Sequence, residues 1–341
     1  MLGFSSYFQD LDEDYIRFAA SHHFKYVMTS LQIPEEDYSD LSEKLPRFLN
    51  LLKELDLVLI PDVSPETFNC LKIEKNDFKA IKSLGFTTIR LDYGFDDART
   101  LKTLMQDFKV VLNASIIEEP LLEQLKKEDV DLTQLKAMHN FYPRVDSGLK
   151  RDEFVEKNKL LRKYGIQVMA FICGDELKRF PMYEGLPSLE MHRDLSPLAS
   201  CIDLMENLEV DDMFIGDSQA TKETIVALEN YVEHKTVFLR AIDLDESLYG
   251  MPLKLRKENC PDVIRIATPR TKNIHPKGRQ LRPVGAITMD NALMGRYCGE
   301  VQIVKKELKR DTRVNVIGYV HPDYIDVIQF IQSPMQILFI K

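Results

Sequence analysis

With 341 residues, 44% of them hydrophobic and 29% charged, the chain can hold one large domain plus a small one, or two medium-sized domains. The net charge of -9 and the pI near 5.4 argue against a general nucleic-acid-binding or anionic-membrane-binding surface, while allowing a local basic pocket. No window approaches the ~20 apolar residues that span a bilayer, and no signal peptide is recognisable. The five cysteines are widely spaced and include no C-x-x-C pair, which predicts reduced thiols in the cytoplasm.

Short apolar runs alternate with amphipathic stretches through the first two thirds of the chain. The runs lie at residues 2–7, 26–29, 57–61, 87–91, 109–112, 135–138, 166–172 and 213–215. Helical periodicity follows at 12–20, 41–52 and 119–127. Eight such units in about 230 residues fit an α/β fold of the (β/α)8 (TIM) barrel type better than an open doubly wound sheet. No G-x-G-x-x-G or P-loop motif supports a nucleotide-binding alternative. We therefore predict a catalytic barrel domain over residues 1–232.

The pattern changes in the last third of the chain. Strand-like segments at 236–241, 263–267, 284–288, 300–304, 314–319 and 336–340 are separated by turn-rich stretches, and a single helix is predicted at 323–332. Residues 233–341 are thus expected to form a small, mainly antiparallel β-barrel domain. No low-complexity linker precedes it, which favours tight packing of the two domains.

Four predicted strands are followed by an aspartate, and in a (β/α)8 barrel the active site forms at these carboxyl ends. The four residues are Asp62, Asp92, Asp175 and Asp217. One such aspartate can simply cap the following helix, but four together favour a catalytic site. Two carboxylates that face one substrate can divide the acid and base roles, because repulsion and unequal burial separate their pKa values. Other side chains at strand ends are expected to bind substrate, namely Tyr7, Asn113, His139, Asn140, Tyr142 and Ser218.

Two loops add further candidates. Residues 139–144 (HNFYPR) fit either an aromatic turn stabilised by Pro143 or a loop that contacts a sugar or an acyl group, with Arg144 free to pair with an anion. The long loop at 174–193 carries Glu190, His192 and Arg193. These residues fit either a charged helix start at the surface or a site in which Arg193 binds a carboxylate or phosphate and Glu190 accepts protons.

The sequence gives little support for a metal site or for a serine or cysteine nucleophile. The His22-His23 pair is too short to chelate well, and no H-E-x-x-H motif or cysteine cluster occurs. No G-x-S-x-G motif marks a serine nucleophile, and Cys173 lies in or beside an apolar strand. We expect neither a metal nor another cofactor.

Several longer motifs together resemble the 6-phospho-N-acetylmuramidases. They are residues 1–7 (MLGFSSY), 139–144, 174–175 (GD), 183–193 (YEGLPSLEMHR), 215–218 (IGDS), 282–291 (RPVGAITMDN), 296–303 (RYCGEVQI) and 315–318 (NVIG). The resemblance covers essentially the whole chain. Its departures are small: Cys173 stands where a proline is expected before Gly174-Asp175, and residues 147–150 (SGLK) replace a turn richer in hydroxyl groups.

The resemblance implies a (β/α)8 barrel followed by a cyclophilin-like β domain. It also implies an exo-acting glycoside hydrolase that releases N-acetylglucosamine from 6-phospho-N-acetylmuramyl-N-acetylglucosamine during cytoplasmic salvage of cell-wall peptidoglycan sugars. The partner would be this phosphorylated amino-sugar disaccharide; a homo-oligomer is left open. Because the substrate carries a phosphate and a carboxylate, we expect cations at its site, and Arg144, Arg193 and Arg296 are the candidates.

In the expected mechanism, Asp175, Asp217 or Glu190 protonates the leaving oxygen, and Asp92 or Asp62 acts as nucleophile or base, or orients the acetamido group of the substrate. The second domain is expected to direct polar side chains at the ligand, namely Arg282, Asn291 and Arg296. Its alternative role is a purely stabilising lid. Two other functions remain open: a barrel lyase or isomerase, and a binding protein for a phosphorylated sugar.

Overall fold

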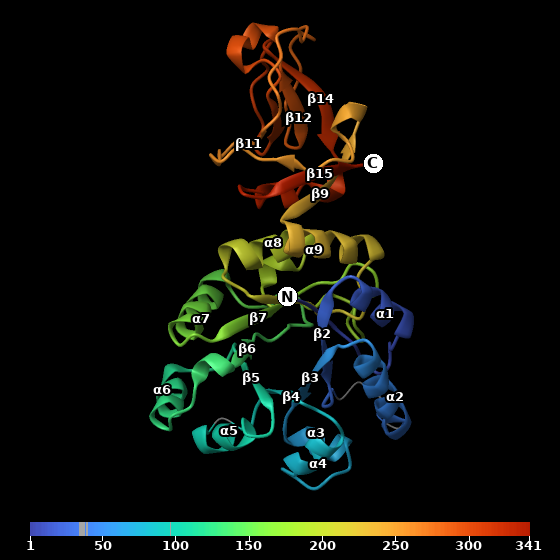
Figure 1. The fold of residues 1–341 in the computed structure, drawn as a ribbon, viewed down its shortest axis with the longest axis vertical. Coiled ribbons are helices and arrows are strands. Elements are labelled where there is room, and N and C mark those ends of the chain that lie inside the picture. The colour runs from blue at the N-terminus through green and yellow to red at the C-terminus, as the bar shows by residue number, and fades with distance from the viewer. Residues whose placement is uncertain (34–37, 39, 96) are drawn as a thin grey trace. The chain divides into compact units, whose positions relative to one another are not determined.

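The computed structural model describes residues 1–341 except 34–37, 39 and 96. The chain divides into two compact units, Met1–Ile225 and Val226–Lys341 (Figure 1). The predicted domain boundary at 232/233 lies inside helix α9 (Lys222–His234), which contributes residues to both units.

The first unit is built on a closed barrel of eight parallel strands, which confirms the predicted fold class. Strand β1 pairs with β2 on one side and with β8 on the other, and this second pairing closes the barrel. The strands are β1 (Leu2–Ser5), β2 (Phe24–Ser30), β3 (Val58–Val63), β4 (Thr88–Leu91), β5 (Lys109–Asn113), β6 (Lys136–Met138), β7 (Gln167–Ile172) and β8 (Asp212–Ile215).

Helices surround these strands in Figure 1. They are α1 (Glu13–Ser21), α2 (Leu41–Glu54), α3 (Pro65–Cys70), α4 (Phe78–Ser83), α5 (Ala98–Leu104), α6 (Glu119–Lys127), α7 (Arg151–Lys163), α8 (Pro197–Asn207) and α9. Side-chain caps start several of them: Asp12 accepts a hydrogen bond from the Tyr15 backbone N–H at α1, and Asp77 and Asp97 do the same for α4 and α5. These caps satisfy backbone donors that a helix leaves free at its first turn.

Large side chains fill the middle of the barrel. Met28, Ile60, Met169 and Phe214 belong to one buried cluster there. A Cβ added at Gly3 would lie 2.4 Å from the Phe214 ring, so this position needs a glycine. Because the interior is packed rather than open, substrates can reach the barrel residues only at the ends of the strands.

The second unit is a mixed seven-stranded sheet in the order β10-β15-β9-β14-β12-β13-β11. The pair β15 and β9 is parallel and the other pairs are antiparallel. Its two edges meet, because the Arg256 N–H donates to the Arg265 carbonyl at 2.9 Å and the Ala267 N–H to the Lys254 carbonyl at 2.8 Å. The strands are β9 (Thr236–Ile242), β10 (Leu253–Lys254), β11 (Val263–Ile266), β12 (Ala286–Asp290), β13 (Val301–Val304), β14 (Val314–Val320) and β15 (Gln336–Ile340).

The helix predicted at 323–332 is wrong. Two separate 3-10 turns, Pro322–Tyr324 and Val327–Gln329, occupy this region. The His321 side chain accepts a hydrogen bond from the Asp323 N–H, and the Asp326 side chain accepts one from the Val327 N–H. Such local bonds between side chain and backbone compete with a continuous helix.

A buried carboxylate ties the second unit together. Glu300 is 1% exposed and lies 2.7 Å from Arg265, 2.9 Å from Arg270 and 3.3 Å from Arg256. The Arg265 contact lowers the pKa of Glu300 against the opposing effect of burial. Strand β11, the turn before it and the loop after it therefore meet at a single acid.

We predict that Glu300→Gln lowers the free energy of unfolding by about 2 kcal/mol or more, because it leaves three clustered guanidinium groups without their shared counter-charge. Urea denaturation measures this change. The matched control, Glu307→Gln, replaces an exposed acid and should change stability by less than about 0.5 kcal/mol. Equal unfolding midpoints for the two variants would contradict this role of Glu300.

Candidate active site

A cavity of about 350 Å³ opens where the carboxyl ends of β2, β3, β4 and β6 meet the loop after β7. Parallel pairing brings these ends to one edge, so residues far apart in the chain become neighbours. Its lining consists of Ser30, Gln32, Ile33, Asp62, Arg90, Asp92, Asn140, Phe141, Pro143, Arg179, Pro181 and Met182. Of the sequence candidates, Asp62, Asp92 and Asn140 are brought together here.

Arg90 connects these three candidates from inside the barrel. Its side chain is 2% exposed, and its Nη1 pairs with Asp62 Oδ1 and lies 3.5 Å from Asp92 Oδ1. Its Nη2 donates to the side-chain oxygen of Asn140 and to the Met138 carbonyl. One guanidinium group from β4 thus holds side chains from β3, the end of β4 and the end of β6.

The two carboxylates occupy different environments. Burial raises the pKa of Asp62 to about 6, with Arg90 opposing this shift and the charge of Asp92 adding to it. Asp92 is about a quarter exposed and accepts hydrogen bonds of 2.9 Å from the side-chain amides of Gln32 and Asn113. The cavity therefore offers one buried acid with a raised pKa beside a second acid that two amides hold in place.

Asp217 and Asp175 support the backbone instead of lining this cavity. The Asp217 carboxylate is fully buried and accepts backbone N–H groups from Gly174 (2.8 Å), Arg179 (3.0 Å) and Leu186 (3.2 Å). Asp175 accepts the Thr221 N–H at 2.8 Å, at the start of α9. Both therefore hold the 174–193 loop and its neighbours in shape, as capping aspartates do.

Glu190 and Arg193 form a second structural pair. Arg193 Nε donates to Glu190 Oε1 at 2.6 Å, and its two Nη atoms donate to four backbone carbonyls and to Glu190 Oε2. Glu190 also accepts the Asp146 and Gly148 N–H groups, and the Arg193 contact lowers the pKa of Glu190 to about 2. Because the guanidinium donors are already in use, Arg193 joins two loops and has little left to offer a ligand.

His192 and His139 are fully buried away from the cavity lining. His192 Nε2 lies 3.0 Å from Asp203 Oδ2. The His139 ring stacks on Phe154 with 4.1 Å between ring centroids, and its Nε2 lies 2.8 Å from Asn158 Oδ1. Both rings thus contact helices behind the barrel strands.

The remaining candidates divide between the two units. In the first unit, the Tyr7 hydroxyl donates to the Gly216 carbonyl and the Ser218 hydroxyl donates to Asp10. The side-chain amide of Asn113 donates to Asp92. Tyr142 is half-buried, and Arg144 is exposed. In the second unit, Asn291 is fully buried and bonds Asn315, Arg282 donates to the Lys309 carbonyl, and Arg296 lines a cavity of about 370 Å³ with Arg270 and Lys272. Ligand contacts of Arg282, Asn291 and Arg296 stay a prediction.

Among the lining residues with charged or amide side chains, sequence reasoning missed Arg90, Gln32 and Arg179. A signal existed for Arg90, since a charged residue between Ile89 and Leu91, two positions before Asp92, lies on the same side of its strand as that acid. No such signal exists for Arg179, because it belongs to a loop whose path depends on tertiary contacts.

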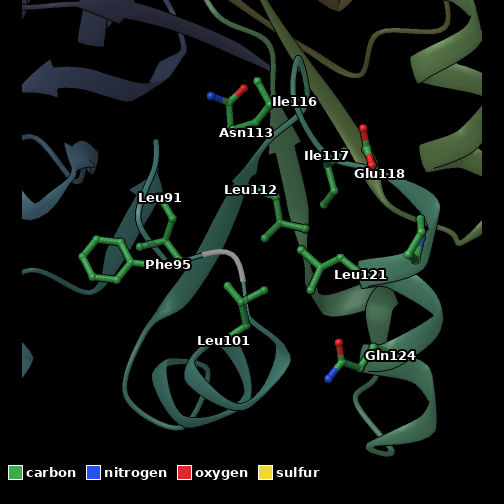
Figure 2. Close-up of a pocket in the computed structure, with 11 residues that line it drawn as sticks. Leu91, Phe95, Leu101, Leu112, Asn113, Ile116, Ile117, Glu118, Leu121 and Gln124 are labelled. Atoms are coloured by element: carbon green, nitrogen blue, oxygen red, sulfur yellow. The ribbon is translucent and has the colours of Figure 1, made fainter.

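A second cavity of about 370 Å³ lies between α5 and α6, and most of the residues that line it are apolar. Figure 2 shows Leu101, Leu112 and Leu121 around this space, with Asn113 at one end. Asn113 also donates to Asp92, so this cavity adjoins the side chains behind the acidic site.

The described residues contain no group of three or more His, Cys, Asp or Glu side chains arranged to hold a metal ion. Over the same residues, each helix is too short or too polar to cross a membrane.

Fold and site together define a (β/α)8-barrel protein with two carboxylates and a buried arginine in a cavity at the strand ends. Two family models identify it further: 6-phospho-N-acetylmuramidase, N-terminal, matches residues 2–230, and 6-phospho-N-acetylmuramidase, C-terminal, matches residues 243–340. The chain therefore belongs to the 6-phospho-N-acetylmuramidase family, as the resemblance predicted.

Two solved structures resemble the whole chain. A conserved protein from a locus in Enterococcus faecalis, with an unknown function, is 28% identical, with a TM-score of 0.87 over 100% of this chain and 96% of that one. An uncharacterized B. cereus protein is 25% identical, with a TM-score of 0.79 over 100% of this chain and 99% of that one. No curated protein matches the chain.

The buried His139 generates a prediction about stability. Burial lowers its pKa from 6.5 to about 4, so the ring stays neutral in the folded protein at pH values where the unfolded chain already binds a proton. Acidification therefore favours unfolding, and between pH 7 and pH 5 this residue should remove about 2 kcal/mol of stability. Urea denaturation at both pH values measures the loss. His139→Asn should show a correspondingly smaller pH dependence, and an unchanged dependence would contradict the assignment.

Proposed function

We propose that the chain is a 6-phospho-N-acetylmuramidase that hydrolyses 6-phospho-N-acetylmuramyl-N-acetylglucosamine to N-acetylmuramic acid 6-phosphate and N-acetylglucosamine. Family membership supports this reaction. The observation that carries the proposal is the presence of two unequal carboxylates, Asp62 and Asp92, in one cavity at the strand ends. Glycoside hydrolysis uses two carboxyl groups in this way. The proposed setting is the cytoplasmic salvage of cell-wall sugars.

Asp62 is the proposed general acid. A pKa near 6 leaves part of its population protonated close to neutral pH, so it can donate a proton to the leaving glycosidic oxygen. This assignment replaces the sequence-based candidates Asp175, Asp217 and Glu190, because their carboxylate oxygens already accept backbone or arginine hydrogen bonds outside the cavity lining.

Asp92 is the proposed second carboxylate. Gln32 and Asn113 fix its orientation. This suits a group that activates a water molecule, or orients the acetamido oxygen of the substrate, for attack on the anomeric carbon as the bond to the leaving oxygen breaks. Gln32 donates through Nε2, and its Oε1 is buried without a hydrogen-bond partner among the described residues. That oxygen is therefore a proposed acceptor for a substrate hydroxyl or amide N–H.

A lyase or isomerase that uses a Schiff base receives less support. Lys136 begins β6 at the opposite end of that strand, where it pairs with Asp212 at 2.6 Å. The proposed acid–base mechanism needs no cofactor, and its partner is the phosphorylated amino-sugar disaccharide.

We predict that Asp62→Asn and Asp92→Asn each lower the rate of hydrolysis by about 10²–10⁴, the range that acid–base catalysis contributes. Mass spectrometry of released N-acetylglucosamine measures the rates. Asp175→Asn, a strand-end acid outside the cavity lining, is the matched control and should retain most activity. Full activity of Asp62→Asn would refute its role as the acid. Failure of the folded wild-type protein to cleave the disaccharide would refute the proposed function.

The pH profile provides a second prediction. If Asp62 must be protonated, kcat/KM should fall as pH rises through about 6, because the acid loses its proton in that range. Rates measured from pH 5 to pH 8 test this sign. The residual kcat/KM of Asp62→Asn should not fall as pH rises through this range. A wild-type kcat/KM that rises with pH through this range would exclude Asp62 as the acid.

A further inference from the structure

Arg179 is a buried cation on the wall of the acidic cavity. Arg179 is only 7% exposed and lines this cavity. Among the described residues, no carboxylate forms an ion pair with it, and its Nε is buried without a hydrogen-bond partner. Burying a charge without a counter-charge is costly, and a bound anion would supply the missing negative charge.

The other buried arginines of the first unit have an acidic partner, which Arg179 lacks among the described residues, although the Nε of Arg90 is also buried without a hydrogen-bond partner there. Arg90 pairs with Asp62, and Arg193 pairs with Glu190. Both guanidinium groups are neutralised within the protein and hold structural elements together. Arg179 has the burial of these residues without their acidic partner, although it lines the same cavity as Arg90.

Aromatic rings hold the Arg179 guanidinium in place. Its central carbon lies 4.9 Å from the Tyr7 ring centroid, 5.4 Å from that of Phe180 and 5.8 Å from that of Phe141. The backbone N–H of Arg179 donates to Asp217 at 3.0 Å, which fixes the loop that carries it. These contacts limit the side-chain motion of Arg179 without using its guanidinium donors, so little conformational entropy remains to be lost when a ligand binds.

We infer that Arg179 binds the anionic substituent of the ligand, a phosphomonoester or a carboxylate, at the wall of this cavity. The planar guanidinium group can donate two parallel hydrogen bonds to either oxyanion. The identity of the ligand rests on the proposed function, under which the substrate carries both a phosphate and a lactyl carboxylate. The inference of an anion at Arg179 rests on its burial without an acidic partner in the described part of the chain and does not depend on the proposed function.

Calorimetric titration of the full-length protein with inorganic phosphate and with D-lactate tests anion binding without any catalysis. Arg179→Gln should weaken binding of the preferred anion by about tenfold or more, because it removes charge-assisted hydrogen bonds. Arg179→Lys keeps the positive charge but loses the planar pair of donors. Its anion affinity should lie between those of the wild type and Arg179→Gln. Lys178→Gln removes a neighbouring cation outside the cavity lining and should leave binding unchanged. If Arg179→Gln does not fold, Arg179→Lys carries the test.

Kinetics then distinguish the two anions. If Arg179 binds the phosphate, Arg179→Gln should lose most of the preference in kcat/KM for the phosphorylated disaccharide over its unphosphorylated counterpart. If it binds the lactyl carboxylate, both substrates should lose kcat/KM equally. Anion binding that depends on Arg179 without any cleavage would refute the proposed function and support this inference. Equal anion affinity in the wild type and both Arg179 variants, or no binding to the wild type, would overturn the inference.

Discussion

The acidic site depends on the burial of one arginine within the barrel. Arg90 is almost completely removed from water, which is favourable only with counter-charges and hydrogen-bond acceptors around it. Asp62, Asp92 and Asn140 supply them from β3 and from the ends of β4 and β6. The same contacts that stabilise the guanidinium group therefore place two carboxylates in one cavity. Their unequal burial then separates their environments, which acid–base chemistry requires.

The acids at the strand ends and in the 174–193 loop have two kinds of role. Asp62 and Asp92 line the cavity, whereas Asp217 and Glu190 accept backbone N–H groups and hold the loop at 174–193. This loop supplies Arg179 to the cavity wall, so the structural acids act on the site through the backbone. Strand-end carboxylates can thus be abundant in a barrel although only some of them can reach a ligand.

Buried charged residues occur in both units, with different partners. In the second unit, Glu300 lies among Arg256, Arg265 and Arg270, and the charges are satisfied within the fold. In the first unit, Arg179 has no such partner among the described residues, and aromatic rings hold it instead. The difference between a satisfied and an unsatisfied buried charge separates a structural cluster from a candidate ligand site.

The sequence by itself determined the eight-stranded barrel, the β-rich second unit and the family, because strand periodicity, strand-end polar residues and long motifs are local properties of the chain. It also identified Asp62, Asp92 and Asn140 as candidates. Only the tertiary structure decided which acids keep free access to the cavity, since the partners of Asp217 are 31 to 43 residues away and those of Arg193 include carbonyls about 50 residues away. Arg179 likewise became visible only through its burial, because a loop residue carries no periodic signal of its surroundings.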